Sequence, residues 1–262
     1  MLLRAMEEGR PEDTWSVREA PLEHLSPLLA CAVVKAEDSS FFRHHGVEWA
    51  SLWSATQGWV QGSASRGGST LTQQLARNLY LSPERTAHRK LRELLAAREL
   101  ESTLNKWRIL ELYLNTVEWG EGVWGAASAS EYYFGKAPET LDAFEASFLA
   151  GLLAAPRRAL VGKNAARARA VQSRVLSQLL DSGLLERREY TRALMRMDAL
   201  HAALEQNQPL RAALLVARGF TGNTTGKIPG PMLMNTVLRE ECGWAREHAT
   251  AAVYSETLRH GR

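Results

Sequence analysis

Apolar residues recur at three- and four-residue intervals along most of this 262-residue chain, and stretches in which apolar and polar residues alternate are scarce. Such intervals place apolar side chains along one face of an α-helix, whereas a half-buried strand needs alternation. The sequence therefore predicts an all-α fold. The expected helices are 47–61, one from near Thr70 that ends before Pro83, one from Ser82 to about Leu104, and 106–117, 126–134, 141–154, 165–181 and 186–205.

Two of these helices begin with recognisable capping residues. Thr70 followed by Gln73 fits a capping box, in which each residue satisfies a backbone N–H of the other. Ser82 followed by Pro83 fits an N-cap with proline at the first helical position. The Gly/Ser-rich stretch "QGSASRGGS" before Thr70 predicts a flexible loop.

Composition sets loose bounds on function. With 45% apolar residues the chain can bury a substantial core, as one large domain or as two lobes. A formal net charge of +3 suits an anionic ligand, a nucleic acid or an anionic membrane surface without choosing among them. The N-terminus has no apolar signal segment, and no stretch reaches the roughly 18 consecutive apolar residues of a membrane-spanning helix. We expect a soluble chain, or a fragment whose membrane anchor is missing.

The stretch "VVKAEDSSFFRHHG", residues 33–46, holds two adjacent carboxylates between apolar segments. Charged groups that are buried without partners are costly. Glu37 and Asp38 are therefore either solvated by a turn or held at a working site.

The stretch "GGSTLTQQLARN" is a Gly-rich loop that opens a helix, and its first backbone N–H groups form an anion site. Four polar side chains at i, i+3, i+4 and i+7 share one stripe of that helix: Thr70, Gln73, Gln74 and Arg77. Arg85, Arg89 and Lys90 follow on the next helix, so a pyrophosphate could be held from both. The alternative is a solvated polar face behind a flexible loop.

A third carboxylate, Glu93, lies four residues after Arg89 and three after Lys90. This pattern alone is usually a surface ion pair of small energetic value. Glu93 gains a functional meaning only if Glu37 faces it across a cleft, because two carboxylates in different environments can divide into a base and a charge-organising partner.

Four stretches occur in the order "EDSSFFRHHG", "GGSTLTQQLARN", "RKLRE" and "KWRILELYLNTVEWGEGVWGAASASEYYFGK". Together they resemble the successive signature motifs of the peptidoglycan glycosyltransferases, glycosyltransferase family 51, from about Cys31 to about Leu180. The last stretch, and the lack of Ser-x-x-Lys and Lys-Thr-Gly motifs, most resemble the monofunctional biosynthetic transglycosylase type. The resemblance implies an all-α, lysozyme-like two-lobed domain that polymerises lipid II, a lipid-linked disaccharide-peptide.

On this resemblance the chain has three parts. They are an N-terminal lead-in (1–30), a glycosyltransferase domain (31–185) and a C-terminal helical extension of unknown role (186–262).

The resemblance also gives roles to residues of the first motif. Glu37 matches the general base that deprotonates the 4-hydroxyl of the acceptor sugar, which explains a carboxylate at the lip of a cleft. Four neighbours match residues that shape the turn: Asp38, Phe41, His44 and Gly46. Asn115, in the last motif, is expected to be structural.

The second and third motifs imply a grip on the donor substrate. Arg77 and Arg85 match cations that hold the donor's pyrophosphate, and Glu93 resembles a second carboxylate that organises the leaving group or a divalent cation, Mg or Mn. No organic cofactor is expected. The remaining residues of these motifs are Ser69, Thr70, Gln73, Gln74, Arg89 and Lys90.

The expected reaction joins lipid II to a growing glycan strand with inversion, giving a β-1,4 product and undecaprenyl pyrophosphate. The implied place is the outer, periplasmic face of the bacterial inner membrane, with the membrane surface and cell-wall synthesis proteins as partners and no nucleic acid. Trp49 and Trp53 on the expected 47–61 helix suit a membrane interface, or else pack into the small lobe.

Two alternatives keep the same fold. A lytic enzyme that cleaves glycan strands would also use a catalytic Glu, but it needs no cations for a pyrophosphate, so Arg77, Arg85 and Lys90 argue against it. A non-catalytic scaffold would be expected to have lost one carboxylate, and both Glu37 and Glu93 are present.

Overall fold

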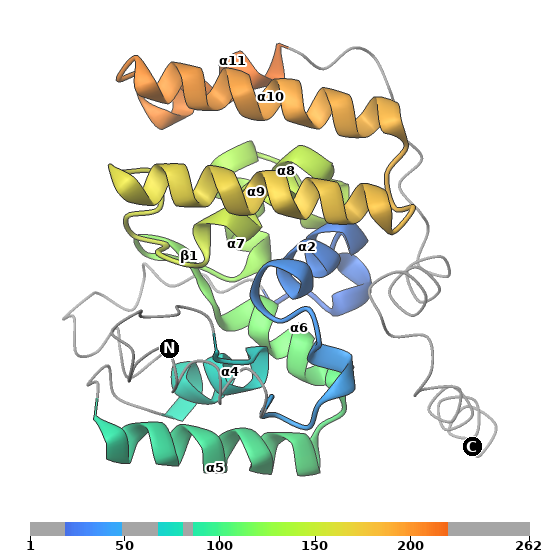
Figure 1. The fold of residues 1–262 in the computed structure, drawn as a ribbon, viewed down its shortest axis with the longest axis vertical. Coiled ribbons are helices and arrows are strands. Elements are labelled where there is room, and N and C mark those ends of the chain that lie inside the picture. The colour runs from blue at the N-terminus through green and yellow to red at the C-terminus, as the bar shows by residue number, and fades with distance from the viewer. Residues whose placement is uncertain (1–18, 49–67, 81–85, 220–262) are drawn as a thin grey trace, which may run out of the picture.

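The computed structural model describes residues 19–48, 68–80 and 86–219 (Figure 1). The expectations for Trp49 and Trp53, for the helix start at Ser82 and Pro83, and for Arg85 lie outside the described residues.

The described residues are predominantly helical, which confirms the all-α prediction. The described ranges also contain three 3₁₀ turns: η2 (Leu22–His24), η3 (Phe41–Arg43) and η4 (Pro138–Thr140). The α-helices are α2 (Pro27–Glu37), α4 (Leu71–Tyr80), α5 (Ala87–Thr103), α6 (Lys106–Thr116), α7 (Ala126–Phe134), α8 (Ala143–Leu152), α9 (Lys163–Asp181), α10 (Arg187–Glu205) and α11 (Leu210–Arg218).

A short antiparallel hairpin, which the sequence did not indicate, follows α6. Strand β1 (Glu118–Gly120) pairs with strand β2 (Val123–Trp124), and Gly122 in the turn has a φ of 75°. Strands of three and two residues are too short to produce a visible alternation of apolar and polar residues. Trp119 in β1 is fully buried, so the hairpin belongs to the core.

The described starts of α5 and α4 each show a side-chain cap. Helix α5 begins at Ala87, and the Thr86 hydroxyl accepts from the backbone N–H of Arg89. At α4 the Thr70 hydroxyl accepts from the backbone N–H of Gln73 at 3.2 Å, but the Gln73 amide donates to the Gly46 carbonyl. Only half of the expected capping box is present, because the Gln73 side chain is used in a tertiary contact.

Helix α8 packs against α2, α9 and α10, and all of its residues are buried. It begins with a capping box between Asp142 and Glu145, and its small residues allow neighbours to approach closely. A Cβ on Gly151 would lie 2.9 Å from the carbonyl oxygen of Ala168, so glycine permits the close contact between α8 and α9. Helix α2 packs against both of these helices.

The helices form successive layers (Figure 1). Helices α4 and α5 pack together at one end, α4 also contacts α6, and α2 lies between them and the α8–α9 pair. Helices α10 and α11 form the layer at the opposite end, where α10 packs on α8 and α9. Glu37 is the last residue of α2, and its hydrogen bond with Gln74 links this helix to α4.

Part of the C-terminal extension shares this core. Arg196 of α10 is buried, pairs with Asp142 at the start of α8, and stacks its guanidinium over the Phe144 ring at 4.2 Å. Met197 and Leu200 belong to the same buried cluster as the residues of α8. The division of the chain at residue 186 stays a prediction, and α10 stabilises the start of α8 from beyond it.

Candidate active site

Glu37 is held by a hydrogen-bond chain that crosses three helices. It is the last residue of α2, and its Oε2 accepts from Nε2 of Gln74 on α4 at 2.9 Å. The Oε1 atom of the same Gln74 amide accepts from the hydroxyl of Tyr113 on α6 at 3.0 Å. Tyr113 therefore holds Gln74 in place, and Gln74 in turn holds the Glu37 carboxylate.

Burial raises the pKa of Glu37 above the ordinary value for a glutamic acid. The hydrogen bond from Gln74 and the positive charges of Arg167, Arg77 and Arg174 oppose this rise. A carboxyl group with a raised pKa, still held by a donor and three cations, is suited to accept a proton and to lose it again.

Asp38, the neighbouring carboxylate, has a structural task. Its side chain is buried, its Oδ2 accepts from the backbone N–H of Leu71 at 2.9 Å, and both oxygens lie 3.0 Å from Nε2 of His44. A carboxylate at the first turn of α4 satisfies an unpaired N–H and interacts favourably with the helix dipole. Asp38 therefore joins the first motif to the second.

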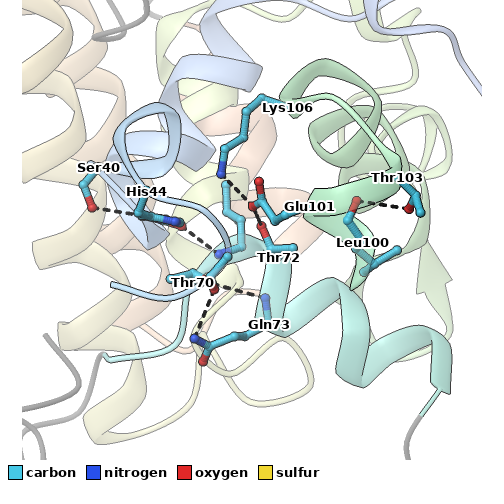
Figure 2. A network of polar contacts seen from close by, with 12 residues as sticks. Ser40, His44, Thr70, Thr72, Gln73, Leu100, Glu101, Thr103 and Lys106 are labelled. Atoms are coloured by element: carbon cyan, nitrogen blue, oxygen red, sulfur yellow. Dashed lines mark hydrogen bonds and ion pairs between the residues drawn. The ribbon is translucent and has the colours of Figure 1, made fainter. Parts of the chain in front are cut away.

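The side chains of Thr70 and Gln73, which lie close together in Figure 2, join the start of α4 to a turn at Gly46. The hydroxyl of Thr70 and the amide of Gln73 both donate to the Gly46 carbonyl, at 2.6 and 3.2 Å. Gly46 has a φ of 81°, and a Cβ there would lie 3.1 Å from the carbonyl oxygen of Ala97 on α5. Both the positive φ and the close approach to Ala97 favour glycine at position 46.

A second network beside this turn joins three helices (Figure 2). Oε1 of Glu101 on α5 accepts from the Thr72 hydroxyl of α4 at 2.5 Å and from the Lys106 ammonium of α6 at 2.6 Å. Lys106 also lies over the Phe41 ring, 4.4 Å from its centroid. These contacts fix α4 against α5 and hold the polar stripe of α4 in place.

Glu93 is fully buried, unlike the surface ion pair that its spacing usually indicates. Its oxygens accept from Nη1 of Arg89 at 2.8 Å and from Nζ of Lys90 at 2.5 Å. The Lys90 ammonium also donates to Ser69 Oγ at 3.0 Å and to Gln73 Oε1 at 2.9 Å. Glu93 thus reaches the second motif through Lys90.

A pocket of about 260 Å³ adjoins Glu37. Glu37 and Asp38 line it together with Ser69 and Thr70, whereas Glu93 is not among its lining residues. The two glutamates therefore do not face each other directly across this pocket. Further lining residues from α2 and α9 are Lys35, Arg174 and Gln178.

The α9 side of this pocket carries functional candidates that the sequence reasoning missed. Arg174 donates to the Ala36 carbonyl at 3.2 Å, and Lys35 donates to Ser182 at 2.7 Å. Arg167 precedes Arg174 by seven residues, a spacing that places both on one face of α9. The seven-residue spacing could have indicated a shared cationic face, but it does not reveal that this face of α9 lies beside α2.

A divalent cation at Glu93 finds little support in this geometry. Arg89 and Lys90 occupy the two carboxylate oxygens, and within the described ranges no group of three His, Cys, Asp or Glu could hold a metal ion. The described residues therefore do not fit a metal centre at Glu93, and a requirement for Mg or Mn stays a prediction.

Comparison with known proteins relates this chain to one protein family. The profile of the family described as Transglycosylase matches residues 7–180. A biosynthetic peptidoglycan transglycosylase of Rhodopseudomonas palustris (strain TIE-1) is 43% identical over 165 residues, which cover 58% of this chain and 70% of that protein. Another, of Rhodospirillum centenum (strain ATCC 51521 / SW), is 45% identical over 141 residues, 54% of this chain and 61% of that protein.

The likeness extends to a longer protein. Penicillin-binding protein 1A of Escherichia coli (strain K12) is 39% identical over 182 residues, which are 69% of this chain and 21% of that protein. Among the described residues, no helix has the length and apolar character needed to span a bilayer.

Proposed function

Since this chain belongs to the transglycosylase family, we propose that it polymerises lipid II into β-1,4-linked peptidoglycan strands and releases undecaprenyl pyrophosphate. The expectation that it is a glycosyltransferase is confirmed by the family and by the names of its relatives. The substrate, the leaving group and the catalytic base are the parts that we propose.

The observation that carries the proposal is the environment of Glu37. The carboxylate lines the pocket, its pKa is raised by burial, and Gln74 holds one of its oxygens. A general base needs hydrogen-bond reach of a hydroxyl and a pKa near the working pH. This environment supports Glu37 as the base that takes the proton of the acceptor 4-hydroxyl.

The reaction balances as a displacement with inversion. Glu37 accepts the proton of the 4-hydroxyl, and the oxygen forms a bond to the anomeric carbon of the growing strand. The bond from that carbon to the pyrophosphate breaks, and its electron pair leaves with undecaprenyl pyrophosphate. The transition state combines oxocarbenium character with negative charge on the leaving oxygen, so fixed cations stabilise it.

The second and third motifs supply these cations in our proposal. Arg77 is half-buried on α4, one turn after Gln74, and close enough to influence the pKa of Glu37. Arg85 would extend the phosphate grip. Each base or phosphate contact of this kind typically contributes about 10²–10⁴-fold in rate. Lys90, tied to Ser69 and Gln73, would orient the loop that precedes α4.

Glu93 would act on this site through its cationic neighbours. It is buried and bound to Arg89 and Lys90, so it holds two positive charges in place instead of meeting the substrate itself. The growing strand, the membrane surface at the periplasmic face of the inner membrane and cell-wall synthesis proteins are the partners that the proposed reaction implies.

The deciding experiment incubates the chain with fluorescently labelled lipid II and separates the products on a gel. We expect a ladder of glycan polymers that disappears on lysozyme treatment. In a parallel reaction with purified glycan strands and no lipid II, we expect no cleavage products. Release of muropeptides from those strands would favour the lytic alternative, and no product in either reaction would favour the scaffold.

A further inference from the structure

We propose that Tyr113 is a positioning residue that fixes the Gln74 amide with its NH₂ group toward Glu37. Tyr113 is not among the residues that line the pocket beside Glu37, and it acts through Gln74. This inference rests on the proposed role of Glu37 as the base.

The geometry requires one orientation of the Gln74 side chain. Its Nε2 lies 2.9 Å from Oε2 of Glu37 and its Oε1 lies 3.0 Å from the Tyr113 hydroxyl. The reverse orientation would set a carbonyl oxygen against the oxygen of an ionised carboxylate, where neither has a proton to give. A donor at the far end of the amide therefore selects the productive orientation.

Tyr113 is a dependable donor at this place. Its side chain is fully buried in the second half of α6. Burial and the nearby Glu37 carboxylate raise the pKa of its phenol well above the ordinary value, so the hydroxyl keeps its proton. A buried donor without a partner is costly, which further favours the bond to Gln74.

The fixed amide has two consequences for Glu37. Donation from Gln74 opposes the rise of the Glu37 pKa that burial causes, so the carboxylate stays ionised to lower pH. Because Gln74 holds Oε2, the proposed mechanism uses the other carboxylate oxygen of Glu37 to meet the acceptor hydroxyl. The loss of the Tyr113 hydroxyl should therefore change both the acidic limb of the pH–rate profile and the maximal rate.

Other charged and titratable groups surround Glu37 and set the background for this effect. They belong to α2, to the segments that follow it, and to α4, α6 and α9. They are Lys35, Asp38, Glu48, Arg77, Tyr113, Arg167 and Arg174. Replacing Tyr113 by Phe leaves all the other groups in place and removes one oxygen atom.

The first test compares Tyr113→Phe with Tyr133→Phe. The Tyr133 hydroxyl donates to the Trp119 carbonyl at 3.0 Å, away from Glu37, so it is a matched loss of one tyrosine hydrogen bond. In the lipid II assay we expect Tyr113→Phe to lower kcat roughly tenfold with little change in KM, and to move the acidic limb to higher pH. Tyr133→Phe should retain the wild-type profile. Equal profiles for the two variants would overturn the proposal.

A double-mutant cycle with Gln74→Ala asks whether Tyr113 acts through Gln74. We expect the double variant to have the same rate as Gln74→Ala alone, because the hydroxyl then has no amide to orient. Additive losses would instead assign Tyr113 an independent structural role and contradict the inference.

A measurement without substrate separates this inference from the proposed function. The carboxyl of Glu37 can be titrated by NMR in ¹³C-glutamate-labelled protein, with its signal assigned from Glu37→Gln. Tyr113→Phe should raise the pKa of Glu37 and Tyr133→Phe should not. A raised pKa with no polymerisation by the wild type would reject the proposed function alone, whereas an unchanged pKa would reject the role of Tyr113.

Discussion

The ammonium nitrogen of Lys90 lies 2.5 Å from a carboxylate oxygen of Glu93, whose side chain is fully buried. The same nitrogen donates to Ser69 and Gln73, so one cation joins the interior of α5 to the residues that begin α4. Glu93 is therefore an anchor for the loop beside Glu37, although it does not line the pocket.

The first prediction concerns this anchor. Glu93→Gln removes the negative charge that holds Arg89 and Lys90, and it should lower the free energy of unfolding by about 1–3 kcal/mol because two partly buried cations lose their charged acceptor. The polymerisation rate should fall by more than the loss of folded protein accounts for, since Ser69 and Gln73 lose their fixed position. Urea denaturation and the lipid II assay measure the two effects.

Glu99→Gln is the matched control, because Glu99 is exposed on the same helix. It should change the free energy of unfolding by less than about 0.5 kcal/mol. If the two variants behave alike, Glu93 is not an anchor.

The second prediction tests the base. Glu37→Gln should abolish polymerisation while binding of a lipid II analogue stays within a few-fold of wild type, because the substitution removes proton acceptance and preserves volume. Glu131→Gln, at an exposed position of α7, should polymerise normally. A fully active Glu37→Gln variant would show that another group takes the proton.

The third prediction follows from the sign of the Glu37 shift. Burial raises the pKa of Glu37 in the folded chain, so between its ordinary and its raised pKa the folded state holds more protons than the unfolded state. Stability therefore falls as pH rises through that window, and the ionised carboxylate costs stability at neutral pH. Glu37→Gln should thus unfold at a Tm equal to or above that of wild type at pH 7, and lose this advantage in acid. A lower Tm of Glu37→Gln at pH 7 would contradict the inference that burial raises the pKa of Glu37.

Much of the fold follows from local patterns. The expected helix 126–134 coincides with α7, and the expected end of α9 at residue 181 is observed, because capping residues and apolar intervals act over a few neighbours. Asn115 is structural as expected: its side chain both donates to and accepts from the backbone of Ala20.

The candidate site was only partly predictable. Glu37, Gln74 and Lys90 were expected from motifs, but the contact of Tyr113 with Gln74 depends on how α6 packs against α4. Glu93 shows the same limit, since an i, i+4 pair with Arg89 has the same sequence on an exposed face as on a buried one. Periodicity places residues on a face, and only packing decides what that face meets.

The fourth prediction concerns the phosphate grip. Arg77→Ala should weaken use of the donor, whereas Arg77→Lys should retain more activity because a positive charge persists without bidentate contacts. Arg98→Ala, at an exposed position of α5, controls for the loss of one positive charge. Initial rates over a range of lipid II concentrations separate the variants, and equal rates for all of them would leave Arg77 as a surface residue.

The last prediction concerns Arg174, which lines the pocket from α9. Its positive charge opposes the rise of the Glu37 pKa, so Arg174→Gln should raise that pKa further and move the acidic limb of the pH–rate profile to higher pH. Arg174 is exposed, so the shift should shrink as salt is added, because mobile ions screen such an interaction. Arg188→Gln, an exposed position of α10, should leave the limb in place. If the acidic limb moves equally in both variants, the effect comes from the net charge of the protein. If the limb does not move in Arg174→Gln, Arg174 does not influence the pKa of Glu37.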